Sequence, residues 1–260
     1  MFSIVTPSYN QCQFIAQTID SVLKQSISAN YTIVDGGSTD GTINILHEYS
    51  GYVNNIIIGQ DNGQADAIIK GFLYSNGEIC SYINSDDFFL SGTLAYVEEY
   101  FAKHPDIDVI YGHRLFVNEH GKPIKLWILP PHSDYLMSRW DFIPQETCFW
   151  RRKLMDKVGG IDKLYHFALD YDFFARMMKE GKFVRVNRFL AAFRDHPSSK
   201  TSTQILTVGA KEIEMVRHTQ GISINSYENF VGRTLSFGIR SVSSLTWIIF
   251  KKYLMRRISL

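Results

Sequence analysis

A short apolar segment that ends in two adjacent carboxylates constrains this chain more than any other feature. Residues 79–83 have the composition of a buried strand, and Asp86 and Asp87 follow them closely. In open α/β sheets, ligands bind beyond the carboxyl ends of the strands. Because neighbouring carboxylates repel each other, a hard divalent cation that bridges them to phosphate oxygens would suit this pair. A plain turn in which Asp caps a helix over 91–103 explains the same residues and stays open.

Strands and helices are expected to alternate over about the first 105 residues. Apolar runs predict strands at 3–6, 31–34, 55–58 and 79–83. Helical spacing of apolar residues predicts helices at 13–25, at 64–74 and in a segment ending near 49. This alternation predicts an α/β fold with a mostly parallel sheet and helices on both faces.

The pattern changes after about residue 105. Short strand candidates lie at 107–111, 115–117, 124–128, 183–186 and 190–193, and helices are expected at 151–158 and from about 173 to 181. We therefore expect one catalytic unit over 1–200, with a nucleotide-binding half at 1–105 and a mixed or antiparallel half at 106–200. From 202 onward the pattern is helical, which predicts a C-terminal helical extension over 201–260.

The overall composition argues against several classes of protein. Lys and Arg number 27 against 26 Asp and Glu, so the net charge of +1 offers no basic field for nucleic acid. No apolar run approaches the roughly 20 residues that span a bilayer, and no signal peptide is visible. The three cysteines are odd in number and widely spaced, which favours free thiols in a reducing compartment. We expect a cytoplasmic protein.

Other residues add to the acidic pair. Asp35 ends the second strand, so it should share a sheet edge with Asp86 and Asp87, where it could accept hydrogen bonds from a nucleoside or simply shape a turn. Asp170 lies between apolar residues at a helix start, where it could act as a general base with a raised pKa or cap the helix. His196 is a candidate phosphate contact.

Glycine-rich dinucleotide and phosphate loops, a Gly-x-Ser-x-Gly elbow and His-x-x-x-His zinc spacing are all absent from the sequence. Five other motifs occur in order: SIVTPSYN at 3–10, IVDGGSTDGT at 33–42, DNGQ at 61–64, NSDD at 84–87 and LDYD at 169–172. Their order and spacing over roughly 1–200 resemble the family 2 glycosyltransferases, inverting enzymes with a GT-A fold, and in particular their non-processive bacterial members.

The resemblance implies a nucleotide-sugar donor, with a UDP-sugar expected, an Mn²⁺ or Mg²⁺ cofactor, and transfer of one sugar to a saccharide or lipid-linked acceptor in surface polysaccharide biosynthesis. It also implies roles for individual residues. Thr6, Pro7, Tyr9, Asp35, Asp61, Gly63 and Asp86 would bind the nucleotide part of the donor. Asp87 and His196 would hold the metal, Asp170 would be the catalytic base, and Gln145, Glu146 and Trp150 would form the acceptor-side wall.

The chain departs from the family pattern at several positions. Gly36 stands where many members have a second Asp, and Asn84 replaces the first acid of the Asp-x-Asp form. Leu169 precedes the expected base where Glu is common. The Gln-x-x-Arg-Trp signature of processive synthases is missing, because Leu136 occupies the Gln position before Arg139 and Trp140. With no membrane span, this favours single-sugar addition.

Other classes fit parts of this pattern. A nucleotidyltransferase or other nucleotide-sugar enzyme, and a glycoside hydrolase with paired carboxylates, would also need acids at such an edge. A non-catalytic GT-A-like sugar-binding protein would keep the fold without the chemistry. The presence of Asp35, Asp87 and Asp170 together favours the transferase.

The last segment, 239–260, combines helically spaced apolar residues with five Lys or Arg and no acid. This pattern predicts a basic amphipathic helix on an anionic membrane, here the inner face of the cytoplasmic membrane. Packing on the catalytic unit or pairing with a second chain in a homodimer are the alternatives.

Overall fold

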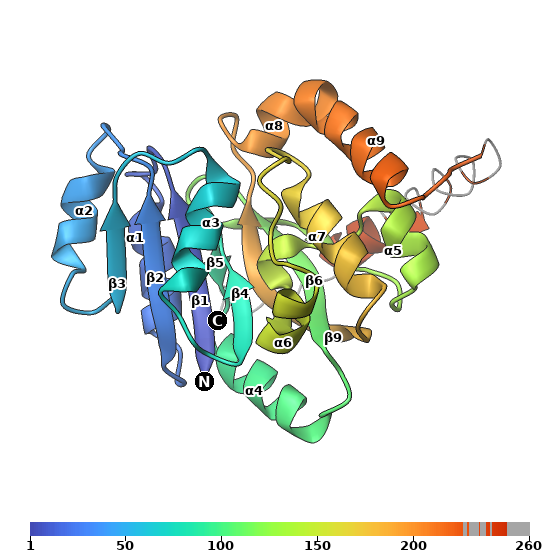
Figure 1. Cartoon of the computed structure of the whole chain (residues 1–260), viewed down its shortest axis with the longest axis horizontal. Coiled ribbons are helices and arrows are strands. Elements are labelled where there is room, and N and C mark those ends of the chain that lie inside the picture. The colour runs from blue at the N-terminus through green and yellow to red at the C-terminus, as the bar shows by residue number, and fades with distance from the viewer. Residues whose placement is uncertain (226–227, 229–233, 235–237, 240, 249–260) are drawn as a thin grey trace.

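A nine-stranded sheet forms the centre of the protein in the part of the chain that the computed structural model describes, residues 1–225, 228, 234, 238–239 and 241–248 (Figure 1). Its path runs β3-β2-β1-β4-β8-β6-β9-β5, and β7 pairs with β6. Helices cover the sheet, and α8 and α9 pass across the top of the view in Figure 1.

The first half of the chain forms the expected parallel sheet. Its strands are β1 (Phe2–Ser8), β2 (Ala29–Asp35), β3 (Asn55–Ile58) and β4 (Ile79–Tyr82), and β1 pairs in parallel with both β2 and β4. The connecting helices are α1 (Ile15–Leu23), α2 (Thr42–Glu48) and α3 (Gln64–Leu73). Because all four strands run the same way, their carboxyl ends meet at one edge of the sheet.

The second half extends this sheet in mixed orientation, as expected. Its strands are β5 (Phe88–Phe89), β6 (Val109–Val117), β7 (Pro123–Trp127), β8 (Phe149–Arg151) and β9 (Phe183–Arg194). The two strands predicted at 107–111 and 115–117 are one strand, β6, and those at 183–186 and 190–193 are one strand, β9. Gly112 lies at their close approach, where an added Cβ would come within 2.4 Å of the Arg188 carbonyl oxygen. A glycine at this position is therefore a packing requirement of the β6–β9 pair.

Several short elements were not expected. They are β5, β8, the helix α5 (Asp134–Trp140) and the 3-10 turn η1 (Gln145–Thr147). Each is too short to show a periodic apolar pattern, so its position depends on partners distant in the sequence. The other helices between residues 90 and 180 are α4 (Thr93–Lys103), α6 (Arg152–Lys157) and α7 (Leu169–Met178).

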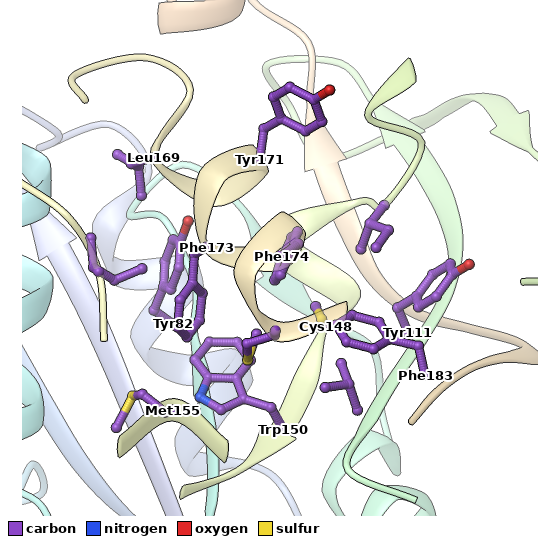
Figure 2. Packing of buried hydrophobic residues seen from close by; sticks show 14 of the residues in the cluster. Tyr82, Tyr111, Cys148, Trp150, Met155, Leu169, Tyr171, Phe173, Phe174 and Phe183 are labelled. Carbon is purple, nitrogen blue, oxygen red and sulfur yellow. The ribbon is translucent and has the colours of Figure 1, made fainter. Parts of the chain in front are cut away.

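Two hydrophobic clusters lie on opposite faces of the sheet. Neighbouring residues of β1 belong to different clusters, because successive side chains of a strand point to opposite faces. Val5 joins the cluster that contains α3 and α7, and Ile4 joins the cluster that contains α1 and α4. The first cluster is rich in aromatic rings that pack beneath α7 (Figure 2). Leu169 and Tyr171, at the start of α7, belong to this cluster, so their packing helps to position the beginning of the helix.

The chain is helical after β9, through α8 (Lys200–Gln204), the π-helical turn η2 (Ile205–Gly209) and α9 (Ala210–Thr219). Residues 241–248 are also helical, while 249–260 lie outside the described residues. Ile239 is buried in the α7 cluster, and the Ser243 Oγ accepts a hydrogen bond from the Ile128 amide at 2.9 Å. The start of the predicted amphipathic tail therefore packs on the catalytic unit. Within the described residues, no helix has the length and apolar character needed to cross a bilayer.

Candidate active site

A cleft of about 1220 Å³ opens at the carboxyl ends of β1 and β4, and α7 and α8 close its other side. Most of the residues singled out from the sequence line it: Pro7, Tyr9, Asp61, Gly63, Asp86, Asp87, Gln145, Glu146 and Asp170. They come from both halves of the chain. The cleft thus combines the carboxylates at the end of β4 with the carboxylate at the start of α7.

Two residues expected to bind the nucleotide do not line the cleft. Thr6 is fully buried, and its hydroxyl is 2.9 Å from the Tyr31 hydroxyl. Asp35 is also buried, and its carboxylate accepts hydrogen bonds from the amides of Gly37 and Ser38 and from the hydroxyls of Ser8 and Ser38. Neither side chain reaches the surface of the cleft in this geometry, and their expected role in nucleotide binding stays a prediction. Asp35 shapes the turn after β2, which is the structural alternative that the sequence left open.

Asp61 occupies the space beside this turn. A Cβ added at Gly36 would lie 2.9 Å from the Asp61 Oδ2, and both residues line the cleft. A side chain at position 36 would therefore collide with the Asp61 carboxylate. In this cleft the Asp61 carboxylate occupies the space that a side chain at position 36 would need.

Asp86 and Asp87 do not cap the helix that follows them. The N-cap residue of α4 is Gly92, and no side chain caps this helix. Asp87 is only 1% exposed, and its Oδ1 accepts a hydrogen bond from the Arg194 amide at 2.9 Å. Burial, together with the neighbouring Asp86, raises the pKa of Asp87 well above its usual range. A carboxylate held in this way favours a nearby positive charge.

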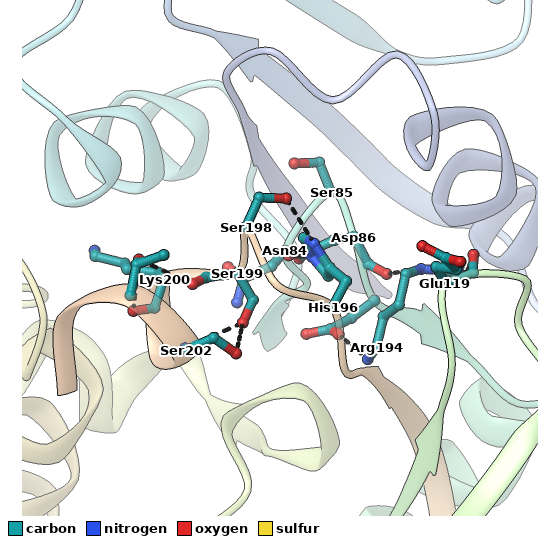
Figure 3. A network of polar contacts seen from close by, with 12 residues as sticks. Asn84, Ser85, Asp86, Glu119, Arg194, His196, Ser198, Ser199, Lys200 and Ser202 are labelled. Carbon is teal, nitrogen blue, oxygen red and sulfur yellow. Dashed lines mark hydrogen bonds and ion pairs between the residues drawn. The ribbon is translucent and has the colours of Figure 1, made fainter.

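Residues at and just after the end of β9 contact both Asp86 and Asp87, and Figure 3 shows Arg194 and His196 beside Asp86. The buried Arg194 guanidinium donates to the carbonyl oxygens of Asp86 and Glu119, each at 2.7 Å, and to the Gln17 side chain at 2.6 Å. The His196 Nε2 is 3.1 Å from the Asp86 Oδ2, and its Nδ1 is 2.9 Å from the Ser198 hydroxyl. The turn that carries Asp86 and Asp87 is therefore tied to β9.

These residues fit a divalent cation that takes some of its ligands from a substrate. Asp86 and Asp87 line the cleft and supply carboxylate oxygens, while the imidazole of His196, outside the cleft lining, is 3.1 Å from Asp86; both kinds of donor suit Mg²⁺ or Mn²⁺. Among the described residues, no three His, Cys, Asp or Glu side chains form a ready metal cage. A cation at this place would consequently need phosphate oxygens or water to complete its coordination.

Asp170 is not the cap of α7 either. The N-cap residue is Ala168, and Glu212 of α9 accepts hydrogen bonds from the amides of Phe167 and Ala168 at 2.7 and 2.9 Å. This leaves Asp170 in the cleft, where burial raises its pKa. Its neighbour Asp172 lies outside the cleft lining and is buried against Arg176. Of the two acids, only Asp170 lines the cleft.

The residues expected on the acceptor side separate into two groups. Glu146 forms a two-armed ion pair with Arg114, with both N–O distances at 2.7 Å, and the Gln145 Nε2 donates to the Tyr82 carbonyl oxygen at 2.7 Å. Trp150 is fully buried on β8 and packs against Tyr82 and Phe173 (Figure 2). Trp150 does not line the cleft, because its strand pairs inside the sheet between β4 and β6.

Three further residues of the cleft were missed in the sequence. They are Arg114 on β6, Asp141 after α5 and Lys200 at the start of α8. The Lys200 Nζ donates to the Gln64 Oε1 at 2.6 Å and to the His166 carbonyl oxygen, so it links α3 to the segment before α7. None of the three lies in a motif or a periodic pattern. Only the fold brings them to the cleft.

Comparison with known proteins gives the class to which this fold and cleft belong. The chain is 19% identical to TarS of S. aureus, solved in complex with UDP-GlcNAc, with a TM-score of 0.71 over 85% of this chain and 65% of that one. It is 18% identical to the mannosyltransferase PcManGT from Pyrobaculum calidifontis, solved with GDP-Man and Mn²⁺, with a TM-score of 0.60 over 82% of this chain and 64% of that one. The chain thus spans less than two thirds of these two structures, and its fold is that of a GT-A glycosyltransferase.

The sequence comparisons are more specific. Residues 3–159 match the profile of glycosyl transferase family 2. A PGL/p-HBAD biosynthesis glycosyltransferase of Mycobacterium tuberculosis is 27% identical over 178 residues, which are 66% of this chain and 68% of that protein. The chain belongs to glycosyltransferase family 2.

Proposed function

We propose that this protein transfers one sugar from a nucleotide-diphosphate sugar to a hydroxyl of a saccharide or lipid-linked acceptor, with a divalent cation and with inversion at the anomeric carbon. The observation that carries the proposal is that one cleft contains both the Asp86–Asp87 pair and Asp170. The nucleotide sugars in the TarS and PcManGT structures, and the Mn²⁺ in the latter, support such a donor and cofactor. The mycobacterial relative is named for PGL/p-HBAD biosynthesis, and we propose a biosynthetic role for this chain too, in surface polysaccharide biosynthesis.

The donor would lie along the ends of β1 and β4. Pro7, Tyr9, Asp61 and Gly63 line this part of the cleft and are the residues we assign to the nucleoside. Asp86, Asp87 and His196 would hold the cation beside the diphosphate. The cation, when bound, neutralises the negative charge that develops on the leaving diphosphate. Arg194 keeps the two carboxylates in place through its amide and guanidinium contacts.

Asp170 is the residue we assign as general base. Its Oδ1 accepts the Tyr171 amide hydrogen at 2.9 Å, so its Oδ2 is the oxygen that takes the proton from the acceptor hydroxyl. As this proton moves to Asp170, the acceptor oxygen bonds to the anomeric carbon and the bond from that carbon to the diphosphate breaks. A single displacement inverts the configuration, so an α-linked donor gives a β-linked product.

The test is release of nucleoside diphosphate from UDP-glucose, UDP-galactose, UDP-GlcNAc and GDP-mannose, each with Mn²⁺, Mg²⁺ or EDTA. We expect release from at least one donor, dependent on the cation. Asp170→Asn should lower kcat by about 10²–10⁴-fold. Asp156→Asn, an exposed acid on α6, is the matched control and should behave as the wild type. No release from any of the four donors, or unchanged kcat in Asp170→Asn, would contradict the proposal.

We also propose that the C-terminal segment places the enzyme at an anionic membrane. Val242, Leu245 and Ile248 are 55–63% exposed, while Ile239 and Ser243 face the catalytic unit. The basic residues of the segment at 251, 252, 256 and 257 lie outside the described residues. The test is flotation with anionic and with neutral liposomes, comparing the wild type with the triple variant Val242→Ser, Leu245→Ser, Ile248→Ser. Equal flotation of both proteins would contradict membrane binding, and a dimer lost in the variant would indicate pairing of two chains instead.

A further inference from the structure

Asp141 has an unusual backbone conformation in the wall of the cleft. It follows the last residue of α5 with φ 45° and ψ 59°, the left-handed region, and it is one of two residues other than glycine with positive φ among the described residues. Asn, Asp and Gly are the residues that adopt this region most readily. This conformation ends α5 at the cleft, where Asp141 is part of the lining.

The end of α5 is held by two other helices. The Tyr171 hydroxyl of α7 donates to the Ser138 carbonyl oxygen, and the Arg217 Nη2 of α9 donates to the Arg139 carbonyl oxygen at 2.7 Å. The Asp141 amide itself donates to the Met137 carbonyl oxygen at 3.2 Å. These contacts fix the last turn of α5 relative to α7, which also carries Asp170. The backbone positions of Asp141 and Asp170 are therefore fixed relative to each other.

The groups that face Asp141 come from four elements. They are Asp170 and Tyr171 of α7, Arg114 of β6, Arg217 of α9 and Tyr82 of β4. Burial, and then the charge of Asp170, raise the pKa of Asp141 to about 8. The raised pKa favours the protonated form of Asp141 at neutral pH, and in that form the carboxyl group can donate a hydrogen bond. Two carboxyl groups in one cleft with different protonation states can take different roles.

Two cationic side chains line the cleft, Arg114 and Lys200, and both make hydrogen bonds within the protein. Arg114 is paired with Glu146, and Lys200 donates to Gln64 and to the His166 carbonyl oxygen. A negatively charged group placed between the carboxyl groups of Asp141 and Asp170 would be repelled by Asp170, which is ionised when it acts as the base. Trp127 and Ile143 also line the cleft and offer an apolar surface to a sugar ring. These features favour an uncharged polyol.

We infer that Asp141 is an acceptor-binding residue, which donates a hydrogen bond to the hydroxyl next to the one that Asp170 deprotonates, so that the acceptor presents an uncharged pair of neighbouring hydroxyls. This inference rests on the proposed function and adds the acceptor chemistry to it. Asp141 would thereby help to choose which hydroxyl of the acceptor reacts. No motif of the sequence points to this residue.

The experiment uses two substitutions that the left-handed backbone tolerates. Asp141→Asn keeps a hydrogen-bond donor and cannot ionise, while Asp141→Gly removes the side chain. Asp134→Asn, at the other end of α5 and outside the cleft lining, is the control. The full chain is assayed with the donor that it hydrolyses best. Methyl glycosides of glucose, galactose and mannose are the acceptor probes, and water is the reference acceptor.

We expect Asp141→Gly to raise the KM for the glycoside about 10-fold, the effect of one hydrogen bond between uncharged partners, and to lower the ratio of transfer to hydrolysis. Asp141→Asn should transfer nearly as well as the wild type at pH 7. It should also keep its activity above pH 8, where the wild type loses activity because Asp141 ionises. Asp134→Asn should match the wild type at every pH.

Several outcomes would overturn the inference. Wild-type KM values and pH profiles in both Asp141 variants would show that this side chain does not contact the acceptor. Donor hydrolysis by the wild type without transfer to any methyl glycoside would exclude an uncharged diol as the acceptor. If the wild type releases no nucleoside diphosphate from any donor, the proposed function itself is wrong. In that case the melting temperature still reports on Asp141: Asp141→Asn should gain stability relative to the wild type as pH rises from 5 to 8.

Discussion

The ion pair between Arg114 and Glu146 allows a quantitative test of how the cleft is built. Glu146 is 1% exposed and Arg114 17%, and both N–O distances are 2.7 Å. The Arg114 guanidinium also lies over the ring of Phe193 at 4.5 Å. Replacing Arg114 with Met would leave the Glu146 carboxylate buried near Asp87 without its partner. Loss of one partner of a buried pair costs about 3–5 kcal/mol.

The same principle gives the opposite expectation for the double variant. Arg114→Met together with Glu146→Leu removes both charges, and such replacements are often neutral or stabilising. We therefore expect an interaction energy of about 3 kcal/mol or more between the two sites in a double-mutant cycle. In melting temperature, the Arg114→Met loss corresponds to about 6–20 °C for a chain of this size.

Urea unfolding followed by circular dichroism measures these differences, provided that the slope with urea concentration is the same for all four proteins. The exposed pair of Lys103 and Glu99 on α4 is the control, because exposed pairs contribute about 0–1 kcal/mol. A loss below about 1 kcal/mol for Arg114→Met, or additive losses in the double variant, would refute the reasoning.

Three further predictions follow from the site and the core. Asp87→Asn should weaken the Mn²⁺-dependent binding of UDP, which calorimetry with and without EDTA measures. If UDP binding by the variant depends on Mn²⁺ as strongly as in the wild type, Asp87 is not a ligand of the cation. The kcat of the wild type should fall as pH drops through the raised pKa of Asp170, since the base acts ionised, and that decline should begin above the usual value of 3.8. An acid limb that persists in Asp170→Asn would assign it to another group. Gly71→Ala places a Cβ 2.3 Å from the Val5 Cγ1, so it should lower the free energy of unfolding in urea by about 1–3 kcal/mol. Gly51→Ala is the control, because its added Cβ meets no atom within 4 Å and should leave the stability unchanged. Equal effects of the two substitutions would count against this packing.

The parts of the fold that the sequence predicts best are those whose signals are local. The strands at 3–6, 31–34 and 79–83 are apolar runs because the sheet is covered on both faces there, and the carboxylates at their ends follow from strand direction alone. Asp170 could be found because an acid between apolar residues at a helix start is unusual.

Sequence patterns did not predict the position of residues whose contacts come from distant parts of the chain. Trp150 is buried because β8 pairs with β4 and β6, which are far from it in the chain. Asp35 turns inward because Ser8 and Ser38 donate hydrogen bonds to it, contacts that the two motifs containing these serines do not reveal. Asp141 lines the cleft through hydrogen bonds from α7 and α9 to the end of α5. Contacts of this kind leave no pattern in the local sequence.

The most direct test of the central proposal is the anomeric configuration of the sugar released when the enzyme hydrolyses its α-linked nucleotide-sugar donor. Proton NMR, recorded before the free sugar equilibrates, reports this configuration and requires no knowledge of the natural acceptor. Single displacement with Asp170 as the base predicts that the β-anomer appears first. Initial release of the α-anomer would contradict the account.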